Sequence, residues 1–115
     1  MHPAIAEGIR LFNSQQFFEA HEALESVWLT EQGEEKLFLH GLIQVAAAFH
    51  HYQRNNLEGF RRVLAKGMAK LSRFSGERHG VNVDDFKAQM NSWASVGSHL
   101  RTPPPLPHIG TGPRM

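Results

Sequence analysis

The fold is decided by the longest apolar stretch of the chain, residues 34–54, which read EEKLFLHGLIQVAAAFHHYQR. Apolar side chains recur there at every third or fourth position, which is the spacing of one side of an α-helix. They form two neighbouring rows, one with Phe38, Leu42, Val45, Phe49 and Tyr52, the other with Leu39, Ile43, Ala46 and His50. A helix with two apolar rows needs neighbours on more than one side. We therefore predict that this segment is the central, most buried helix.

Four further segments show helical spacing, and they predict helices at residues 3–12, 16–29, 57–74 and from 84 onward. Pro3 suits the first position of a helix, Asn56 and Asp84 are typical N-caps, and Gly97 is predicted to end the last helix. Short connections between helices favour antiparallel neighbours. The sequence therefore predicts an all-α protein, with about five helices in an antiparallel bundle and a loop at residues 75–83.

Aromatic side chains at helical spacing normally fill the interior of a small bundle. We expect the following residues in the core: Phe17, Phe18, Trp28, Phe38, Phe49 and Trp93.

The length of 115 residues suits a single domain with one hydrophobic core. Five of the six prolines lie beyond Thr102, where they exclude a helix and favour an extended conformation. We therefore expect one helical-bundle domain at residues 1–101 and a Pro-rich extended tail at residues 102–115. Leu106 and Ile109 are the residues expected to hold this tail against the bundle.

Composition excludes several classes of protein. The chain has no cysteine, which rules out disulfide scaffolds, thiolate zinc sites and cysteine nucleophiles. Glu7 interrupts the N-terminal stretch before a signal-peptide core can form, and no stretch approaches 18 apolar residues. We therefore expect a cytoplasmic protein that does not enter the membrane.

The charges are unevenly distributed although the net charge is only +1. Seven of the eleven acidic residues lie within residues 7–35, and seven of the twelve Lys and Arg residues lie within residues 54–78. No aromatic residue interleaves the basic face at 62–73, so a solvated face is favoured there over nucleic-acid binding. The opposite bias of the two halves is compatible with self-association into a homo-oligomer.

The residues most suited to chemistry lie at 19–25, which read EAHEALE. Helical spacing places His21 on the same face as Glu25, and His50 lies in an apolar row of the central helix. Imidazoles and carboxylates from facing helices form metal sites in helical bundles. This pattern predicts a buried His/Glu cluster with His21, Glu25 and His50 as ligands of one divalent metal, Zn, Fe, Mn or Ni. Glu22 would then act as base or orienting residue in metal-assisted hydrolysis of an unknown substrate.

Two other interpretations of the same residues remain open. In one, the cluster is a hydrogen-bonded core network without metal, and the protein is a non-enzymatic structural or protein-interaction module. In the other, it is a metal-free acid/base site. Whether the protein is an enzyme is therefore left undecided by the sequence.

Four stretches together resemble the domain-of-unknown-function family 309: Phe12-Asn13, Phe17 to Trp28, Gly41 to His50, and Asn56 with Gly59. The likeness covers about residues 9–72. It implies an all-helical bundle from bacteria or archaea, sometimes labelled a predicted metal-dependent hydrolase. The residues that match the family pattern are Glu19, His21, Glu22, Glu25, Trp28 and His50.

Three positions depart from that pattern. Gln15 and Asn55 stand where the family commonly has glycine, and His40 stands where it commonly has glutamine. The first two concern turns. His40 adds an imidazole that the family does not generally use, so we leave it out of the predicted ligand set.

Overall fold

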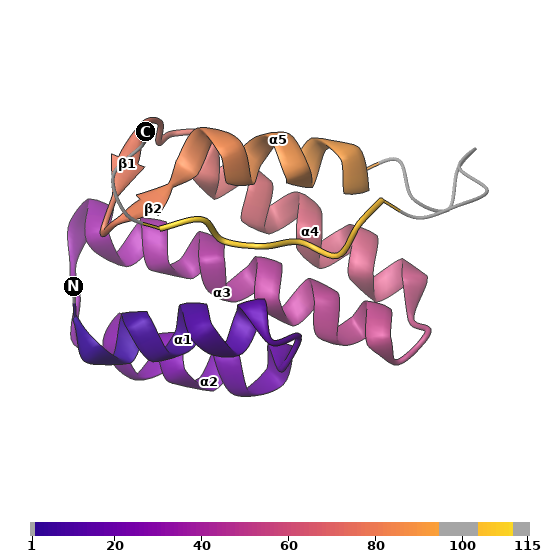
Figure 1. Ribbon diagram of the computed structural model, residues 1–115, viewed down its shortest axis with the longest axis horizontal. Coiled ribbons are helices and arrows are strands. Elements are labelled where there is room, and N and C mark those ends of the chain that lie inside the picture. Colours follow the sequence, from indigo (N-terminus) through magenta and orange to yellow (C-terminus); the bar gives the residue numbers. More distant parts are fainter. Residues whose placement is uncertain (1, 95–103, 112–115) are drawn as a thin grey trace.

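The computed structural model describes residues 2–94 and 104–111 of the chain. These residues form five helices, as predicted: α1 (Pro3–Asn13), α2 (Phe17–Trp28), α3 (Gly33–Gln53), α4 (Leu57–Leu71) and α5 (Val83–Trp93). Figure 1 shows α3 in the middle of the bundle, with α1 and α2 on one side and α4 and α5 on the other. The prediction of an all-α protein is confirmed. Gly97 and the expected domain boundary at residues 101 and 102 lie outside the described residues.

α3 is the central helix, and small residues let α4 approach it closely. A Cβ atom added to Gly67 of α4 would lie 3.0 Å from the carbonyl oxygen of Gly41 on α3. A Cβ atom added to Gly41 would lie 2.9 Å from the side chain of Leu71. The two backbones therefore meet where neither helix carries a side chain. None of the described helices is long and apolar enough to cross a membrane.

The core is built around the ring of Phe49 on α3. Edge-to-face or tilted aromatic contacts join it to rings from four other helices, namely Phe12, Phe17, Phe60 and Trp93, at centroid distances of 5.0 to 6.3 Å. Such geometry adds to the stabilisation gained from burial alone. The expectation for Phe18 was wrong, because its side chain is 45% exposed on the surface of α2.

A short β-hairpin replaces part of the loop predicted at residues 75–83. Strand β1 (Glu77–Arg78) pairs antiparallel with β2 (Val81–Asn82). His79 and Gly80 form the turn with φ of 52° and 76°, the positive values that tight hairpin turns require. The Asn82 side chain then accepts a hydrogen bond from the Asp85 N–H, so Asn82 caps α5 and the prediction for Asp84 was wrong.

Residues 104–111 run beside α5 towards the hairpin (Figure 1) and are called the C-terminal segment below. The Asn13 side chain at the end of α1 bonds both backbone groups of Ile109, at 3.1 and 2.7 Å. Gln89 of α5 bonds both backbone groups of His108 in the same way. Ile109 is only 1% exposed, whereas Leu106 is 41% exposed. Of the two expected anchors, only Ile109 is buried.

Candidate ligand-binding groove

The predicted His/Glu cluster is not buried. Among the described residues, no charged or polar side chain is buried. The His21 and Glu25 side chains are 28% and 46% exposed, and Glu22 is exposed. The reason is the rotation of α2, whose buried row consists of Phe17, Ala20, Leu24 and Val27. This row leaves His21 and Trp28 at its edge.

His50 of α3 lies against Phe18 of α2. Its half-buried imidazole packs on the ring of Phe18, with the centroids 5.2 Å apart. The same phenylalanine stacks on His21 at 6.0 Å. An aromatic ring therefore contacts both imidazoles, and His50 does not line the cavity that His21 and Glu25 share.

That cavity is an open groove of about 250 Å³ between α2, α3 and α4. It is lined by His21, Glu25, Trp28, His40, Ile43, Gln44, Ala47 and Val63. Apolar side chains from α3 and α4 form one part of the lining, and polar side chains from α2 and α3 form the rest. The groove thus combines apolar surface with several groups able to form hydrogen bonds.

Two lysines lie beside the polar side chains of the groove. Lys70 of α4 donates a hydrogen bond to Oε1 of Gln44 at 2.8 Å. Lys36 of α3 places its Nζ 4.6 Å from the centre of the Trp28 ring, which favours a cation–π contact. The Glu25 carboxylate of α2 also lines the groove, so positive and negative side chains both adjoin it.

The half-buried imidazole of His40 lines the groove and has a lowered pKa. Burial lowers the pKa of its imidazole, and the charges of Lys70 and Lys36 lower it further. The ring also packs against Trp28, with the centroids 5.2 Å apart. At neutral pH His40 is therefore uncharged, and it offers one nitrogen as donor and the other as acceptor.

Two nitrogen atoms of the groove side chains lack a hydrogen-bond partner among the described residues. They are Nδ1 of His21 and Nε1 of Trp28, and both are buried. His21 Nε2 lies 3.7 Å from Glu25 Oε2, which is too long for a hydrogen bond. Buried polar atoms are normally paired. Two side chains that line the groove therefore each have a buried nitrogen that the described residues leave unpaired.

The described part of the chain places no three His, Asp or Glu side chains where they could together hold a metal ion. His21 and Glu25 share the groove, but His50 lies beside Phe18 and Glu22 faces solvent. The residues as placed do not fit the metal site that the sequence suggests, and we derive no step through a metal. The ligand set His21, Glu25 and His50 stays a prediction.

Three groove residues were not placed in a functional site from the sequence: His40, Gln44 and Trp28, the last of which was expected in the core. His40 was set aside because the resembled family commonly has glutamine there. The available signal was spacing, since His40 and Gln44 are four residues apart on a helix and therefore share a face. Spacing within one helix could not show that this face meets α2.

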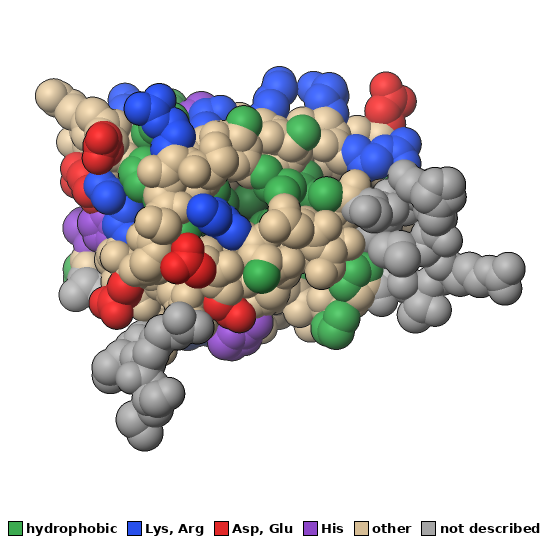
Figure 2. All heavy atoms as spheres, turned by 90° about the horizontal axis from the view of Figure 1, so that it is seen from above, with side chains coloured by type: hydrophobic (Ala, Val, Ile, Leu, Met, Phe, Trp, Pro, Cys, Tyr) green, Lys and Arg blue, Asp and Glu red, His purple; other side chains and the backbone are tan. Residues whose placement is uncertain are grey.

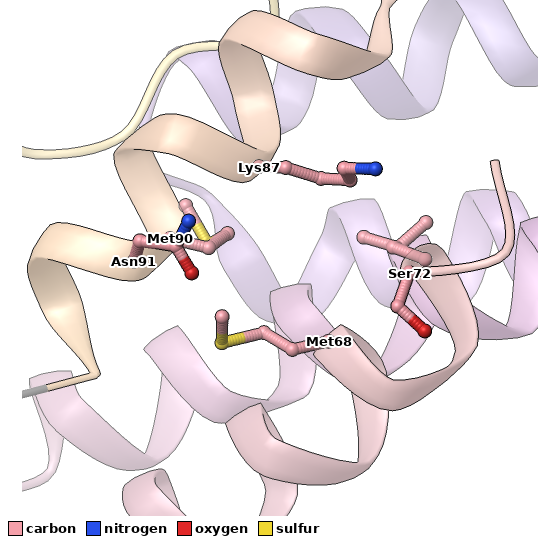
Figure 3. Close-up of a pocket in the computed structure, with 6 residues that line it drawn as sticks. Met68, Ser72, Lys87, Met90 and Asn91 are labelled. Atoms are coloured by element: carbon pink, nitrogen blue, oxygen red, sulfur yellow. The ribbon is translucent and has the colours of Figure 1, made fainter. Parts of the chain in front are cut away.

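A second cavity of about 210 Å³ lies between α4 and α5. Figure 3 shows Met68 and Met90 pointing into it from the two helices, with Ser72, Lys87 and Asn91 around them. Figure 2 views the molecule from above and shows hydrophobic side chains gathered in a hollow of its upper surface. Its one charged lining group, Lys87, donates to the carbonyl oxygen of Phe74 at 2.6 Å. This cavity offers fewer free polar groups than the groove beside α2.

Comparison with known proteins identifies relatives but no activity. An uncharacterized protein of Aquifex aeolicus (strain VF5) is 27% identical over 96 residues, which are 83% of this chain and 28% of the relative. The uncharacterized protein YpuF of Bacillus subtilis (strain 168) is 34% identical over 59 residues, which are 50% of this chain and 34% of the relative. The chain thus spans about a third or less of the length of these relatives.

A family match covers the part of the chain that forms the groove. Residues 5–63 match the family described as "Domain of unknown function (DUF309)". This range runs from α1 into α4 and contains all the residues that line the groove, from His21 to Val63. Since the match extends over more than half of the 115 residues, this chain belongs to the DUF309 family.

Proposed function

We propose that this domain is a non-enzymatic binding module whose ligand site is the groove between α2, α3 and α4. The observation that carries the proposal is one cavity lined by the neutral imidazole of His40 and by His21 and Trp28, each of which has a buried nitrogen without a hydrogen-bond partner among the described residues. Small-molecule sites typically combine apolar walls with a few oriented polar groups. At about 250 Å³ the groove lies just below the usual range of such sites, so its ligand is small.

The two tryptophans give a direct test, because only one of them lies in the groove. In a ¹H–¹⁵N spectrum the Trp28 indole N–H should shift when L-phenylalanine, 3-phenylpropionate or phenylalaninamide is added. The Trp93 indole N–H donates to the Pro105 carbonyl at 3.1 Å and lies outside the groove, so its signal should stay in place. If none of the three probes shifts the Trp28 signal, the proposal is overturned.

A filled groove provides the matched variant. Ala47 lines the groove and is half-buried, so Ala47→Met should occupy the space and abolish the Trp28 shift. Ala88 is exposed on α5, and Ala88→Met adds the same side chain away from the groove. It should leave the shift unchanged. A Trp28 shift that survives in Ala47→Met would place the ligand elsewhere.

Metal-dependent hydrolysis is the second candidate. It rests on residue types alone, since His21 and Glu25 line the same groove and can bind transition metals, but among the described residues no third His, Asp or Glu lies where all three could hold one ion. Equilibrium dialysis against Zn, Mn, Fe or Ni salts distinguishes the candidates. One metal ion per chain that is lost in His21→Ala would favour the second. No stoichiometric metal would favour the binding module.

A further inference from the structure

The cavity between α4 and α5 has a buried apolar floor and a polar rim. Leu71 and Met90 are 1% and 0% exposed, and Met68 packs against the core. Ser72 and Asn91 line the same cavity at exposed positions. Figure 3 shows the two methionines pointing into the cavity from the two helices. An apolar group can therefore leave water in this cavity while a polar group attached to it stays at the rim.

The cavity has room for one ring-sized group. Its volume is about 210 Å³, whereas an engineered apolar cavity of about 150 Å³ in another protein binds benzene. Methionine side chains adapt to the shape of a ligand, and their sulfur atoms make favourable contacts with aromatic rings. Met68 and Met90 can therefore both contact a ring bound between α4 and α5.

Lys87 supplies donors beside this apolar floor. Its Nζ donates a hydrogen bond to the carbonyl oxygen of Phe74, which leaves two of the three N–H groups of the ammonium available. None of the ion pairs among the described residues includes Lys87. Asn91 is four residues further along α5 and also lines the cavity, so its amide can donate from the same side. These groups favour a ligand carboxylate.

The acidic residues of α5 do not neutralise this position. Asp84 Oδ2 accepts a hydrogen bond from the Gly76 N–H at 3.0 Å, and Asp85 Oδ2 accepts one from Gln89 at 2.9 Å. Neither carboxylate lines the cavity. Among the described residues that line it, Lys87 is the one charged side chain, so the charge offered to a ligand is positive.

We propose that the cavity between α4 and α5 binds a small carboxylate with a compact apolar body, the size of a single ring. The carboxylate accepts hydrogen bonds from Lys87, and the apolar body lies on Met68, Leu71 and Met90. This site shares no lining residue with the groove of the proposed function. The two sites can therefore be tested through different signals.

Benzoate, benzamide and benzamidinium test the charge of the ligand, because they share one ring and one planar shape. Their head groups are negative, neutral and positive. Binding is measured by the ε-methyl NMR signals of Met68 and Met90 in protein with ¹³C-labelled methionine, at constant pH and ionic strength. We expect benzoate to bind about tenfold more tightly than benzamide, as is typical of hydrogen bonds to charged groups, and benzamidinium to bind most weakly. Acetate carries the charge without the ring and should leave both signals in place.

A pair of variants assigns the carboxylate to its partner. Lys87→Met removes the ammonium group and keeps an apolar side chain of similar length, so this variant should bind benzoate and benzamide equally. Lys66→Met makes the same change at an exposed position of α4 that does not line the cavity, and it should retain the preference for benzoate. A tenfold preference for benzoate that survives in Lys87→Met would overturn the role given to Lys87.

The comparison of probes on the wild-type protein needs no variant to fold. Unchanged Met68 and Met90 signals up to about 50 mM benzoate, a concentration that exceeds the dissociation constant of all but the weakest sites, would overturn the proposal. Benzamide or benzamidinium that binds as tightly as benzoate would overturn the carboxylate, and an equal response to acetate would overturn the apolar body. None of these outcomes depends on the Trp28 signal, so the groove of the proposed function stands or falls separately.

Discussion

At the scale of single residues, the protonation of His40 is the most direct test of the groove's electrostatics. Burial lowers the His40 pKa, and Lys70 contributes the larger of two charge effects. We expect the imidazole to titrate below its ordinary value of about 6.5, and Lys70→Met to move the midpoint upward. NMR titration of the His40 ring protons measures it. Arg73→Met, at an exposed position without such an effect on His40, should leave the midpoint in place.

The same pKa shift has a consequence for stability. Because the folded protein resists protonation of His40 and the unfolded chain does not, the unfolded state binds more protons just below about pH 6.5. The contribution of neutral His40 to the free energy of unfolding is therefore complete above that pH and is lost as the pH falls further.

His21 illustrates what the sequence could not predict at this scale. Two rows of α2 share Phe17 and Leu24: one continues through His21 and Trp28, the other through Ala20 and Val27. Both have helical spacing, and only packing against the neighbouring helices selects the second row for burial. The side chains of α2 that line the groove were therefore recognised by residue type, but they were wrongly expected to be buried.

At the scale of elements, the contact between α3 and α4 depends on the absence of a side chain at Gly67. A methyl group there would lie 3.0 Å from the Gly41 carbonyl oxygen and 3.2 Å from the Val45 backbone nitrogen. Backbone atoms cannot rotate away, so Gly67→Ala should force the helices apart. We expect a net loss of about 1–3 kcal/mol in the free energy of unfolding, measured by urea denaturation.

Helix propensity opposes that loss and needs its own control. Alanine is favoured over glycine by about 1 kcal/mol inside a helix. Ala69→Gly, at an exposed position of α4, isolates this effect and should destabilise by about that amount. A stabilised Gly67→Ala variant would show that propensity outweighs the close approach.

The start of α3 is tied to the hairpin by Glu35, which pairs with Arg78 and His79. Burial raises the Glu35 pKa, but the hydrogen bonds and charges of His79 and Arg78 outweigh it, and the net pKa lies below the ordinary value. The stability from this carboxylate should be present above about pH 4.3 and disappear as the pH falls through its lowered folded pKa.

Urea denaturation of wild-type protein and Glu35→Gln from pH 7 to pH 3 checks this expectation. The difference in the free energy of unfolding should be largest near neutral pH and shrink in the acid range. Glu22→Gln, at an exposed position of α2, should show no such pH-dependent difference. An equal difference at every pH would contradict the role given to the Glu35 charge.

The helices were predictable because each depends mainly on local spacing and capping, as at Pro3 and Asn56. The hairpin was not, because its strands have only two residues each and no alternating pattern can form over that length. The N-cap of α5 was missed for the same reason, since Asn82 belongs to the second strand as well.

At the scale of the whole molecule, the C-terminal segment completes the core. Ile109 is 1% exposed, so Ile109→Ala should lower the free energy of unfolding by about 2–5 kcal/mol. Leu106, at 41% exposure in the same segment, gives the matched control, and Leu106→Ala should change it by about 0.5 kcal/mol or less. Equal losses in the two variants would mean that the segment is held without its buried side chain.

The pairing of Asn13 with Ile109 joins residues 96 positions apart. During synthesis the contacts between the end of α1 and Ile109 can therefore form only after residues 14–109 have been made. Until residue 109 is available, the end of α1 and the side of α5 expose an uncovered surface to other nascent chains. Folding of this domain should thus finish only after residue 109 has been synthesised, and slowing the codons for residues 104–111 should raise its tendency to aggregate more than slowing those of the central helix.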